Sequence, residues 1–455
     1  MTKRKIFLSV VMAALTQGVW AQLGADTFYV SKDALPDASY YLPAPPDTAS
    51  MDYIDDLLQW QWGKTQRPLP RGRQASDESL WLPRMIESIM AHVLELDTIS
   101  PEATPAIDRL LVRAYHTGNY STKKAKDRYM RIRPFMQMGE DTWAQWDDDY
   151  LRTNGSYPSG HTGIGWATAL AFAEMWPELQ DTILRRGFQF GENRIITGAH
   201  YQSDVNAGYM CGSASIAAAH NNPWFEEDIA AARAEYKRLK GLPADYEPTT
   251  NAGLPHGSRF LNTVVDTTSH RYPGELARYW TAKAFRKTPR GEQAVRNIDS
   301  SAEYMMKLFG DVIGKTISPE TTPALAQLIS DVRTVTTLSA SELKTSHFRK
   351  RPFVQLGEPT AVPVAEDGER GESSYASCHA QIGWAIALVL AEVVPEKQNE
   401  ILRVGYDYGY DRVITGYHWA TDIEAARLLA SAVVARLHAD KSFLELVAKA
   451  KKVTE

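Results

Sequence analysis

Residues 155–162 read Gly-Ser-Tyr-Pro-Ser-Gly-His-Thr, and residues 373–380 read Ser-Ser-Tyr-Ala-Ser-Cys-His-Ala, 218 positions further along the chain. Each stretch is surrounded by the same types of charged residue at the same spacings. The first set comprises Lys126, Arg133, Ser159, Gly160, His161, Arg194, His200 and Asp204, and the second comprises Lys344, Arg351, Ser377, Cys378, His379, Arg412, His418 and Asp422. The chain is therefore a tandem duplication.

The period of this duplication defines two domains. An offset of 218 residues is far longer than the roughly 20 to 50 residues of a solenoid repeat, so each copy has the length of a domain with its own core. Pro70-Arg71-Gly72 recurs as Pro289-Arg290-Gly291 at an offset of 219, which indicates a one-residue insertion or deletion between these landmarks and the motifs. We expect a first domain over residues 22–243 and a second over 244–455, joined through the Pro- and Gly-rich segment 240–258.

The apolar residues follow a helical period. Within residues 79–96 they recur at spacings of three and four, and alternating strand patterns are almost absent from the chain. We expect further helices over residues 105–113, 120–133, 159–175, 179–189 and 200–220, with the same set in the second copy. The pattern predicts an all-α fold of two tandem helical bundles.

The first residues are typical of a secretory signal peptide. A basic start, Lys3-Arg4-Lys5, precedes a short apolar run, and Val19-Trp20-Ala21 offers a small-residue cleavage site, so residues 1–21 are predicted to be removed on export. A membrane anchor or a buried N-terminal helix is the alternative, but the apolar run is short for a membrane span. No later segment is long and apolar enough, so we expect no stable membrane anchor and a periplasmic or secreted location.

Composition limits the class of partner. The chain of 455 residues is 44% hydrophobic, enough for two cores. Loss of three basic residues with the signal takes the formal charge from −5 to −8, which argues against nucleic acid or anionic membranes as general partners. Cys211 and Cys378 stand at non-equivalent positions of the two copies, so we expect both thiols to be free.

Two cations and one turn point to an anion. Lys126 and Arg133 are seven residues apart, which on a helix would aim both at one spot. A solvated basic face is the alternative, because four more basic residues crowd this segment: Lys123, Lys124, Arg128 and Arg131. Ser159 can cap the helix expected after it, whose free N–H groups would attract an anion, or it can be a plain cap beside a buried His161.

A histidine and a carboxylate complete each set. His200 and Asp204 are four residues apart, so on a helix the carboxylate could fix the tautomer of the imidazole and leave its other nitrogen as nucleophile or base. Arg194 adds a guanidinium suited to a tetrahedral oxyanion. Each single motif is weak evidence, but the whole set occurs twice at identical spacing. The set suits a phosphoryl group passing through a charged transition state, with one histidine attacking phosphorus and the other protonating the leaving oxygen.

At these positions the chain resembles a known family. Lys126-x6-Arg133-Pro134, Pro158-Ser159-Gly160-His161 and Arg194-x5-His200-x3-Asp204 resemble the three-part signature of the type 2 phosphatidic acid phosphatase superfamily. Residues 155–162 and the opening 40–46, Tyr-Tyr-Leu-Pro-Ala-Pro-Pro, are similar to its bacterial class A non-specific acid phosphatases.

The resemblance implies a role for each residue. His200 would form a phosphohistidine, Asp204 would orient it, and His161 would be the general acid and then the base, with His418, Asp422 and His379 as their equivalents. The phosphoryl oxygens would be held by Lys126, Arg133, Ser159, Gly160 and Arg194, and in the second copy by Lys344, Arg351, Ser377, Cys378 and Arg412. It implies no metal and no other cofactor, and an acid phosphatase whose partners are small phosphate esters.

The second copy departs from the family pattern. The residue before the third-motif arginine, usually Ser in the family, is Asn193 in the first copy and Asp411 in the second, and an inward-pointing Asp411 would weaken anion binding. Cys378 replaces a glycine, and its side chain could crowd the phosphate. We expect an active first domain and a second that binds phosphate but turns over more slowly, or else serves only as a structural partner; the two copies could form an internal pseudo-dimer.

Three other functions share these motifs. A vanadium-dependent haloperoxidase would bind vanadate with the same residues, and a lipid or pyrophosphate phosphatase of the same superfamily would differ in the loops around the site. A non-enzymatic phosphate-binding module would need one of the two histidines to be missing, and both are present twice. The loops between Arg133 and Gly155 and their counterparts differ in sequence, which predicts two differently shaped pockets.

Overall fold

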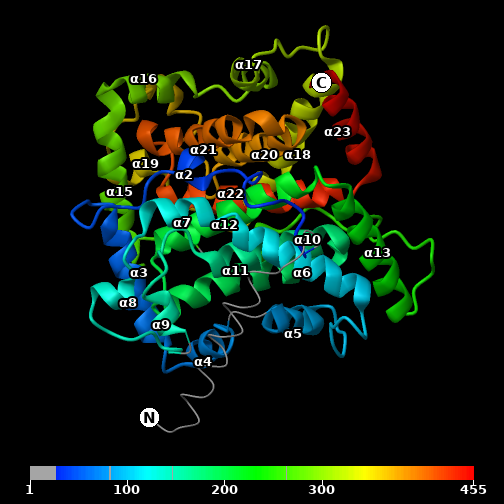
Figure 1. Cartoon of the computed structure of the whole chain (residues 1–455). Helices are drawn as coiled ribbons and strands as arrows, with labels where there is room; N and C mark the ends of the chain where they lie inside the picture. Colours follow the sequence, from blue (N-terminus) through cyan, green and yellow to red (C-terminus); the bar gives the residue numbers. More distant parts are fainter. Residues whose placement is uncertain (1–26, 81–82, 146, 263, 455) are drawn as a thin grey trace.

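The computed structural model describes residues 27–80, 83–145, 147–262 and 264–454, so the signal peptide expected over residues 1–21 lies outside it. Throughout the described residues the regular structure consists of α-helices and short 3-10 helices, and no strand occurs among them (Figure 1). The predicted all-α fold is confirmed.

The first copy runs from the N-terminal arm to the interdomain joint. Its helices are α2 (Ala38–Tyr41), α3 (Tyr53–Gln66), α4 (Pro70–Asp77), α5 (Pro83–Val93), α6 (Pro105–Tyr120), α7 (Lys123–Tyr129), α8 (Pro134–Gln137), α9 (Asp148–Leu151), α10 (Gly160–Met175), η2 (Pro177–Leu179), α11 (Gln180–Ile196), α12 (Gln202–Ala219) and α13 (Pro223–Leu239). No helix lies between Leu239 and Gly257, where the joint was expected.

The second copy repeats this order. Its helices are α14 (Gly257–Phe260), α15 (Tyr272–Ala284), η3 (Phe285–Lys287), α16 (Pro289–Arg296), α17 (Ala302–Ile313), α18 (Pro323–Ser346), α19 (Pro352–Leu356), η4 (Pro363–Ala365), α20 (Cys378–Val393), η5 (Pro395–Lys397), α21 (Gln398–Thr415), α22 (Ala420–His438) and α23 (Lys441–Thr454). The long α18 spans the region that the first copy divides between α6 and α7.

The helix that begins at the Ser-Gly-His turn is the centre of each bundle. Every residue of α10 is buried, because α6, α11 and α12 surround it, and a helix that is apolar all round belongs in a core. Trp166 on this helix donates its indole N–H to the Ser213 hydroxyl at 2.9 Å, and Trp384 does the same to Ser431 at 3.2 Å. The residues at the start of α10 are thereby held on a rigid element.

Several expected helix ends are wrong: the helices expected over residues 105–113 and 179–189 continue to Tyr120 and Ile196, and the one expected over residues 79–96 is confined to Pro83–Val93. Two further differences change the placement of motif residues. The helix expected over residues 120–133 ends at Tyr129, where Met130 takes a left-handed conformation with φ of 40°. Arg133 is extended because the residue before a proline avoids the helical region. The helix expected from residue 200 begins at Gln202, so His200 lies in the turn before it.

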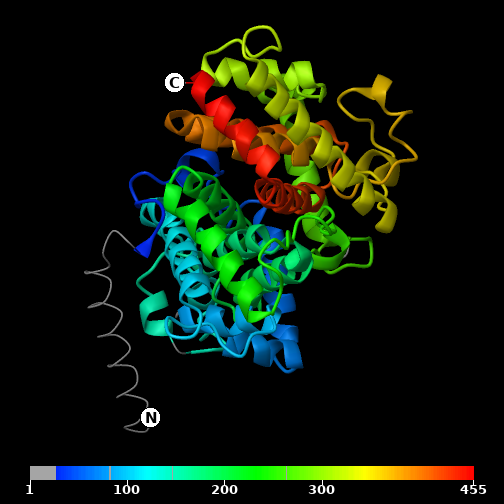
Figure 2. The same ribbon diagram turned by 90° about the vertical axis from the view of Figure 1, so that its right-hand side faces the viewer.

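The two copies pack against each other, with the first copy below the second in Figure 2, and their contacts repeat about a pseudo-two-fold axis. α10 contacts α22, and their equivalents α20 and α12 contact each other. One continuous cluster of buried hydrophobic residues includes members of both copies. Such reciprocal contacts are the mark of a two-fold interface between like subunits, here made within a single chain.

The N-terminal arms are exchanged across this interface. α2 of the first copy packs on α21, and α14 of the second copy packs on α11. The hydrogen bonds repeat as well: the Gln180 side chain donates to the carbonyl of Gly253, and Gln398 donates to that of Ala34, both at 2.9 Å. The copies therefore form an internal pseudo-dimer in which each copy contributes a segment to the other.

A buried clasp lies on the axis itself. The rings of His220 and His438 stack at 3.9 Å. Nε2 of His438 lies 2.8 Å from a carboxylate oxygen of Glu392, and Nε2 of His220 lies 3.3 Å from Glu174. Lys451 contacts the other oxygen of Glu392 at 2.9 Å, so basic groups stand against both carboxylates.

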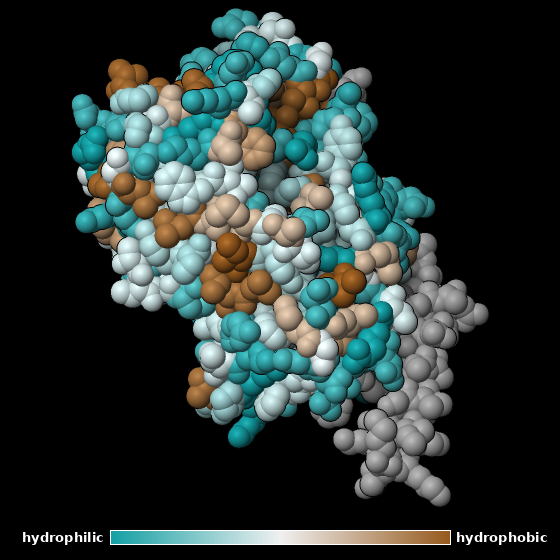
Figure 3. Space-filling view, turned by 90° about the vertical axis from the view of Figure 1, so that its left-hand side faces the viewer, coloured by the Kyte–Doolittle hydropathy of each residue, from teal (hydrophilic) through white to brown (hydrophobic). Residues whose placement is uncertain are grey.

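The described helices offer no membrane span, because none of them is long and apolar enough to cross a bilayer. On the face in Figure 3, hydrophobic residues form small separate groups among hydrophilic ones.

The clasp predicts a stability that depends on pH. Burial alone would lower the pKa of His438, but Glu392 outweighs it and raises this pKa to about 9 from 6.5. A raised pKa contributes stability that is complete below pH 6.5 and is lost as the pH rises through 9. We expect Glu392→Gln to lower the free energy of unfolding at pH 6 by on the order of 3 kcal/mol, with a smaller difference above pH 9. Urea unfolding at both pH values tests this, and an equal difference at both would contradict it.

Candidate active site

The three motifs of the first copy meet at one buried point. Nη1 of Arg133 lies 2.9 Å from Nε2 of His200. Lys126 and Arg133 both donate to the carbonyl oxygen of Gly155, at 2.6 and 3.2 Å. The helical spacing predicted for this pair is wrong, since the chain turns at Met130, but the expected convergence of the two cations is observed by another route.

Hydrogen bonds assign the tautomer of His200. Its Nδ1 lies 3.3 Å from the Ser156 hydroxyl and 3.6 Å from Oδ2 of Asp204. Because Arg133 has only N–H donors to offer, Nε2 is the acceptor and Nδ1 carries the proton. The unprotonated nitrogen therefore faces the cations, which is the orientation that a nucleophile requires.

Asp204 is a cap as well as a partner of His200. His200 precedes the helix, and the Asp204 carboxylate reaches back to accept the Tyr201 N–H at 2.8 Å. Ser156 and Arg131 donate to the same carboxylate, at 2.5 and 2.6 Å. Burial acts to raise the pKa of Asp204, but Arg131, His200 and Ser156 outweigh it and hold this pKa well below its ordinary value.

Arg131, which the sequence left as part of a solvated basic face, is an internal residue. It bridges Asp204 to Asp56 on α3, 2.8 Å away. Burial is the main cause that raises the pKa of Asp56 to about 6. In the second copy Arg349 bridges Asp422 to Glu275, 3.0 Å away. The signal that could have found these residues is the recurrence of Arg131 as Arg349 at the motif offset of 218, together with an acidic residue at both Asp56 and Glu275, 219 positions apart.

Arg194 is a buried cation with donors to spare. Its side chain is 1% exposed, and neither Nε nor Nη1 has a hydrogen-bond partner among the described residues. Arg133, in contrast, gives its N–H groups to the carbonyls of Leu151, Asn154, Ala199 and Gly155. Since buried polar groups are nearly always paired, the unmet donors of Arg194 indicate a place for an anion.

The start of α10 lies beside this cation. Ser159 caps the helix and accepts the Thr162 N–H at 3.4 Å. Gly160 opens the helix, and His161 follows with Nε2 at 3.0 Å from the carbonyl of Ser79. Burial, followed by the charges of Arg194 and His200, holds the pKa of His161 well below 6.5. An anion bound here would oppose these charges and favour the protonated ring.

The second copy reproduces this geometry. Nη1 of Arg351 lies 3.1 Å from Nε2 of His418, whose Nδ1 donates to the carbonyl of Ser374 at 2.8 Å. Nε and Nη1 of Arg412 lack hydrogen-bond partners in the described parts of the chain. The other equivalents keep their contacts: Lys344 to the carbonyl of Ser373, Ser377 as the cap of α20, and Nε2 of His379 near the carbonyl of Ile298.

The side chains of both departures have partners outside the three motifs. Asp411 pairs with Arg290 and accepts from Asn297. The first copy uses Asn193 in the same place, against Arg71. The sulfur of Cys378 lies 3.8 Å from the Thr337 hydroxyl on α18. The expected weakening by Asp411 therefore does not follow from its observed orientation.

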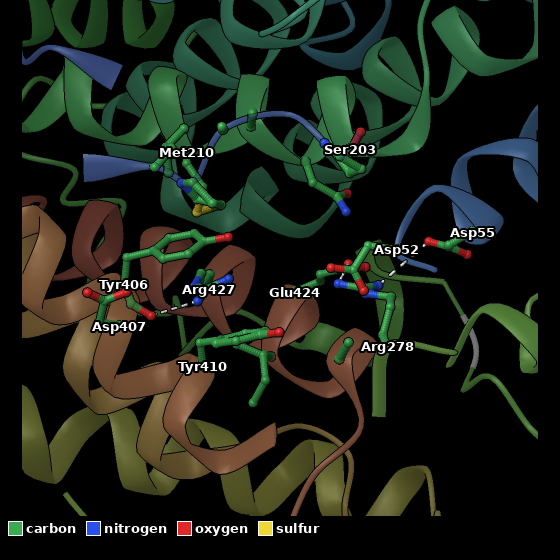
Figure 4. A pocket seen from close by; sticks show the side chains of 18 of the residues that line it. Asp52, Asp55, Ser203, Met210, Arg278, Tyr406, Asp407, Tyr410, Glu424 and Arg427 are labelled. Atoms are coloured by element: carbon green, nitrogen blue, oxygen red, sulfur yellow. Dashed lines mark hydrogen bonds and ion pairs between the residues drawn. The ribbon is translucent and has the colours of Figure 1, made fainter. Parts of the chain in front are cut away.

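A cavity lies elsewhere, between the two copies. It encloses about 430 Å³ and is lined by residues from both, without His200 or His418. Figure 4 shows Arg278 between Asp55 and Glu424, opposite Tyr406 and Arg427. Asp56 also lines it, so the cavity touches the far end of the Asp56–Arg131–Asp204 chain rather than the anion position.

One group of side chains in the described residues could share a cation, and it is the axial clasp of His220, Glu392 and His438. It includes none of the motif residues. Lys451 already occupies one oxygen of Glu392, so this group has its positive charge supplied by the protein.

Fold and site together define an all-α protein with two buried clusters of cations, each beside an oriented histidine. The chain belongs to the PAP2 superfamily, whose family model matches residues 110–228 and again 323–443.

Curated relatives are similar to about half of the chain. They are the non-specific acid phosphatases of Providencia stuartii (36% identity over 231 residues) and Salmonella typhimurium (34% over 237), and the acid phosphatase of Zymomonas mobilis (33% over 242). Each match takes up 50 to 52% of this chain but 90 to 93% of the relative. One copy here thus corresponds to a whole relative.

The bridge through Arg131 predicts a positioning role. Arg131→Met would leave Asp204 buried with one charge partner fewer and loosen His200, and misplacement of a reacting group by about 1 Å can cost about a hundredfold in rate. We expect kcat for an aryl phosphate to fall by about that factor with KM little changed, and Arg131→Lys to restore part of it.

The control for this experiment is Arg128→Met, an exposed arginine three residues earlier. A wild-type kcat in Arg131→Met, with folding verified by circular dichroism, would contradict the positioning role.

Proposed function

We propose that this PAP2 protein is a metal-independent acid phosphatase that hydrolyses phosphate monoesters through a phosphohistidine. The observation that carries the proposal has two parts. Arg194 has buried N–H donors without partners among the described residues, and the unprotonated Nε2 of His200 faces Arg133 in the same site. The relatives' names support this choice of reaction.

The substrate phosphate would bind with its oxygens against the spare donors of Arg194, the ammonium of Lys126 and the N–H groups at the start of α10. Arg133 would transfer its hydrogen bond from Nε2 of His200 to a phosphate oxygen, which frees the lone pair for attack. All of these groups are preorganised and buried, so they stabilise developing charge without solvent reorganisation.

The reaction would proceed in two displacements. Nε2 of His200 bonds to phosphorus while the phosphorus–oxygen bond to the alcohol breaks, and protonated His161 gives its Nδ1 proton to the leaving oxygen. Neutral His161 then takes a proton from water, whose oxygen attacks phosphorus and releases His200. The Nδ1 proton of His200 stays in place, and Asp204 stabilises the positive charge of the phosphorylated ring.

His379, His418 and Asp422 would have the same roles in the second copy, with slower turnover. We place the protein in the periplasm or outside the cell, after removal of residues 1–21. A chelator would leave the activity unchanged, because no step uses a metal.

Silencing each nucleophile separately tests the proposal. We expect His200→Ala to remove most of the phosphate release from p-nitrophenyl phosphate, His418→Ala to remove little, and the double variant to be inactive, because the remaining groups cannot form the covalent intermediate. Wild-type protein denatured in alkali during turnover should carry one phosphate on His200 that is stable in base and labile in acid, visible by mass spectrometry.

Excess chelator in every assay is the control for metal dependence. Equal partial losses in the two single variants would mean two equally working sites. A wild-type protein without phosphatase activity, but active in halide oxidation with added vanadate, would replace the proposal by the haloperoxidase alternative.

The depressed pKa of His161 predicts acid activity. Only protonated His161 can supply the leaving-group proton, and burial with Arg194 and His200 keeps its pKa well below 6.5. We expect kcat/KM, which reports the free enzyme, to fall as pH rises, with the midpoint below 6.5. His161→Asn should cost an alkyl phosphate about 100-fold or more and p-nitrophenyl phosphate much less. Equal losses on both substrates would exclude general acid catalysis by this residue.

A further inference from the structure

The two anion sites differ in the loop that contacts the first-motif arginine, and one of the differences introduces a carboxylate that pairs with this arginine. Position 151 is leucine in the first copy, and its equivalent 218 residues later is Glu369. This difference lies in the loops that the sequence predicts to shape the two pockets differently.

Conserved contacts verify the register of these loops. Asp148 accepts the backbone N–H of Thr142 at 3.1 Å, and Glu366 accepts that of Thr360 at 2.7 Å. The guanidinium of Arg152 lies over the ring of Phe135, and that of Arg370 lies over Phe353, at 5.0 and 5.4 Å. Both pairs keep the offset of 218, so the equivalence of Leu151 and Glu369 is structural.

In the first copy this position carries no charged side chain that could pair with the cations. Leu151 is buried with Phe135 and Ala199 in a small apolar cluster, and only its backbone carbonyl touches Arg133, at 3.0 Å. A second carboxylate in this loop, Asp147, has an oxygen without a hydrogen-bond partner among the described residues, and burial raises its pKa. The charge of Asp147 also acts to raise the pKa of Arg194 and Arg133 against the effect of burial, but Asp147 forms no ion pair with either arginine, in contrast to the pair in the second copy.

In the second copy a carboxylate occupies the equivalent place. Glu369 forms an ion pair with Nη2 of Arg351, whereas the equivalent Nη2 of Arg133 donates to a carbonyl. The charge of Glu369 also reaches Lys344 and Arg412, whose pKa values it raises against the effect of burial. One side chain thus acts on the three cations that would otherwise hold phosphate.

We propose that Glu369 is a resident anion that competes with phosphate for Arg351 and so makes the second site the weaker of the two. This inference rests on the proposed function for the identity of the ligand. The Glu369 side chain is 36% exposed, so it can rotate into solvent when phosphate arrives. Binding in the second copy then requires breaking one ion pair and placing two negative groups near each other.

The test is calorimetric titration with inorganic phosphate, which needs no turnover. An Arg194→Met background removes the main donor of the first site, so the second is measured alone. We expect Glu369→Gln and Glu369→Leu to lower the dissociation constant for phosphate by about ten- to a hundredfold, the range of a charge-assisted hydrogen bond.

The reciprocal change is the matched control. In an Arg412→Met background, Leu151→Glu should raise the dissociation constant of the first site by a similar factor. A background variant that fails to fold is covered by making Glu369→Gln, Glu369→Leu and Leu151→Glu singly in the otherwise wild-type chain. Each of these changes should alter the ratio of the two phosphate dissociation constants.

An unchanged second-site constant in both Glu369 variants would overturn the inference, as would two equal sites in the wild type. These outcomes are separable from the phosphatase proposal. A protein that hydrolyses phosphate esters but binds phosphate independently of Glu369 refutes only the competition. A protein without hydrolysis whose phosphate affinity rises in Glu369→Gln refutes only the reaction.

Discussion

The rest of the site depends on the hydrogen bonds that the carboxylate of Asp204 accepts. It accepts from Ser156 in the second motif, Arg131 beside the first, and the backbone of Tyr201 in the third, and its own carbonyl accepts the Ser159 N–H at 2.9 Å. One buried side chain therefore ties together three segments that are far apart in the sequence. Removing a partner from such a buried charge is costly, typically about 3 to 5 kcal/mol, so the geometry around His200 is held firmly.

The cations of the site are stabilised differently from this carboxylate. Lys126 and Arg133 rest on backbone carbonyls rather than on acids, and burial lowers the pKa of both. Acidic partners would stabilise the fold more, but they would occupy the anion position. Carbonyl oxygens hold the cations in place while leaving their net charge uncompensated, and this charge is what a phosphoryl group can use.

Much of this could be predicted from the sequence, because the duplication acts as an internal control. The all-α fold and the two copies required only spacing and helical period. The convergence of Lys126 and Arg133 was predicted as well, although the helix expected to produce it ends at Tyr129, between the two residues. The turn at Met130 and the start of α12 after His200 could not be predicted. A helical period does not distinguish the last residue of a helix from a residue that caps it. Arg131 and Asp56 were missed because a single exposed-looking basic residue gives no sign of a partner 75 positions away.

Duplication within one chain also permits the two sites to diverge while the fold stays symmetric. The exchanged arms and the axial clasp need both copies, so the second copy supports the fold whatever its site does. Glu369, which stands where the first copy has Leu151, alters one pocket and leaves the interface between the copies unchanged. Since the buried cations of the second site remain in place, an internal carboxylate also offsets part of their mutual repulsion. Weaker phosphate binding and a more stable second bundle are thus two results of the same ion pair.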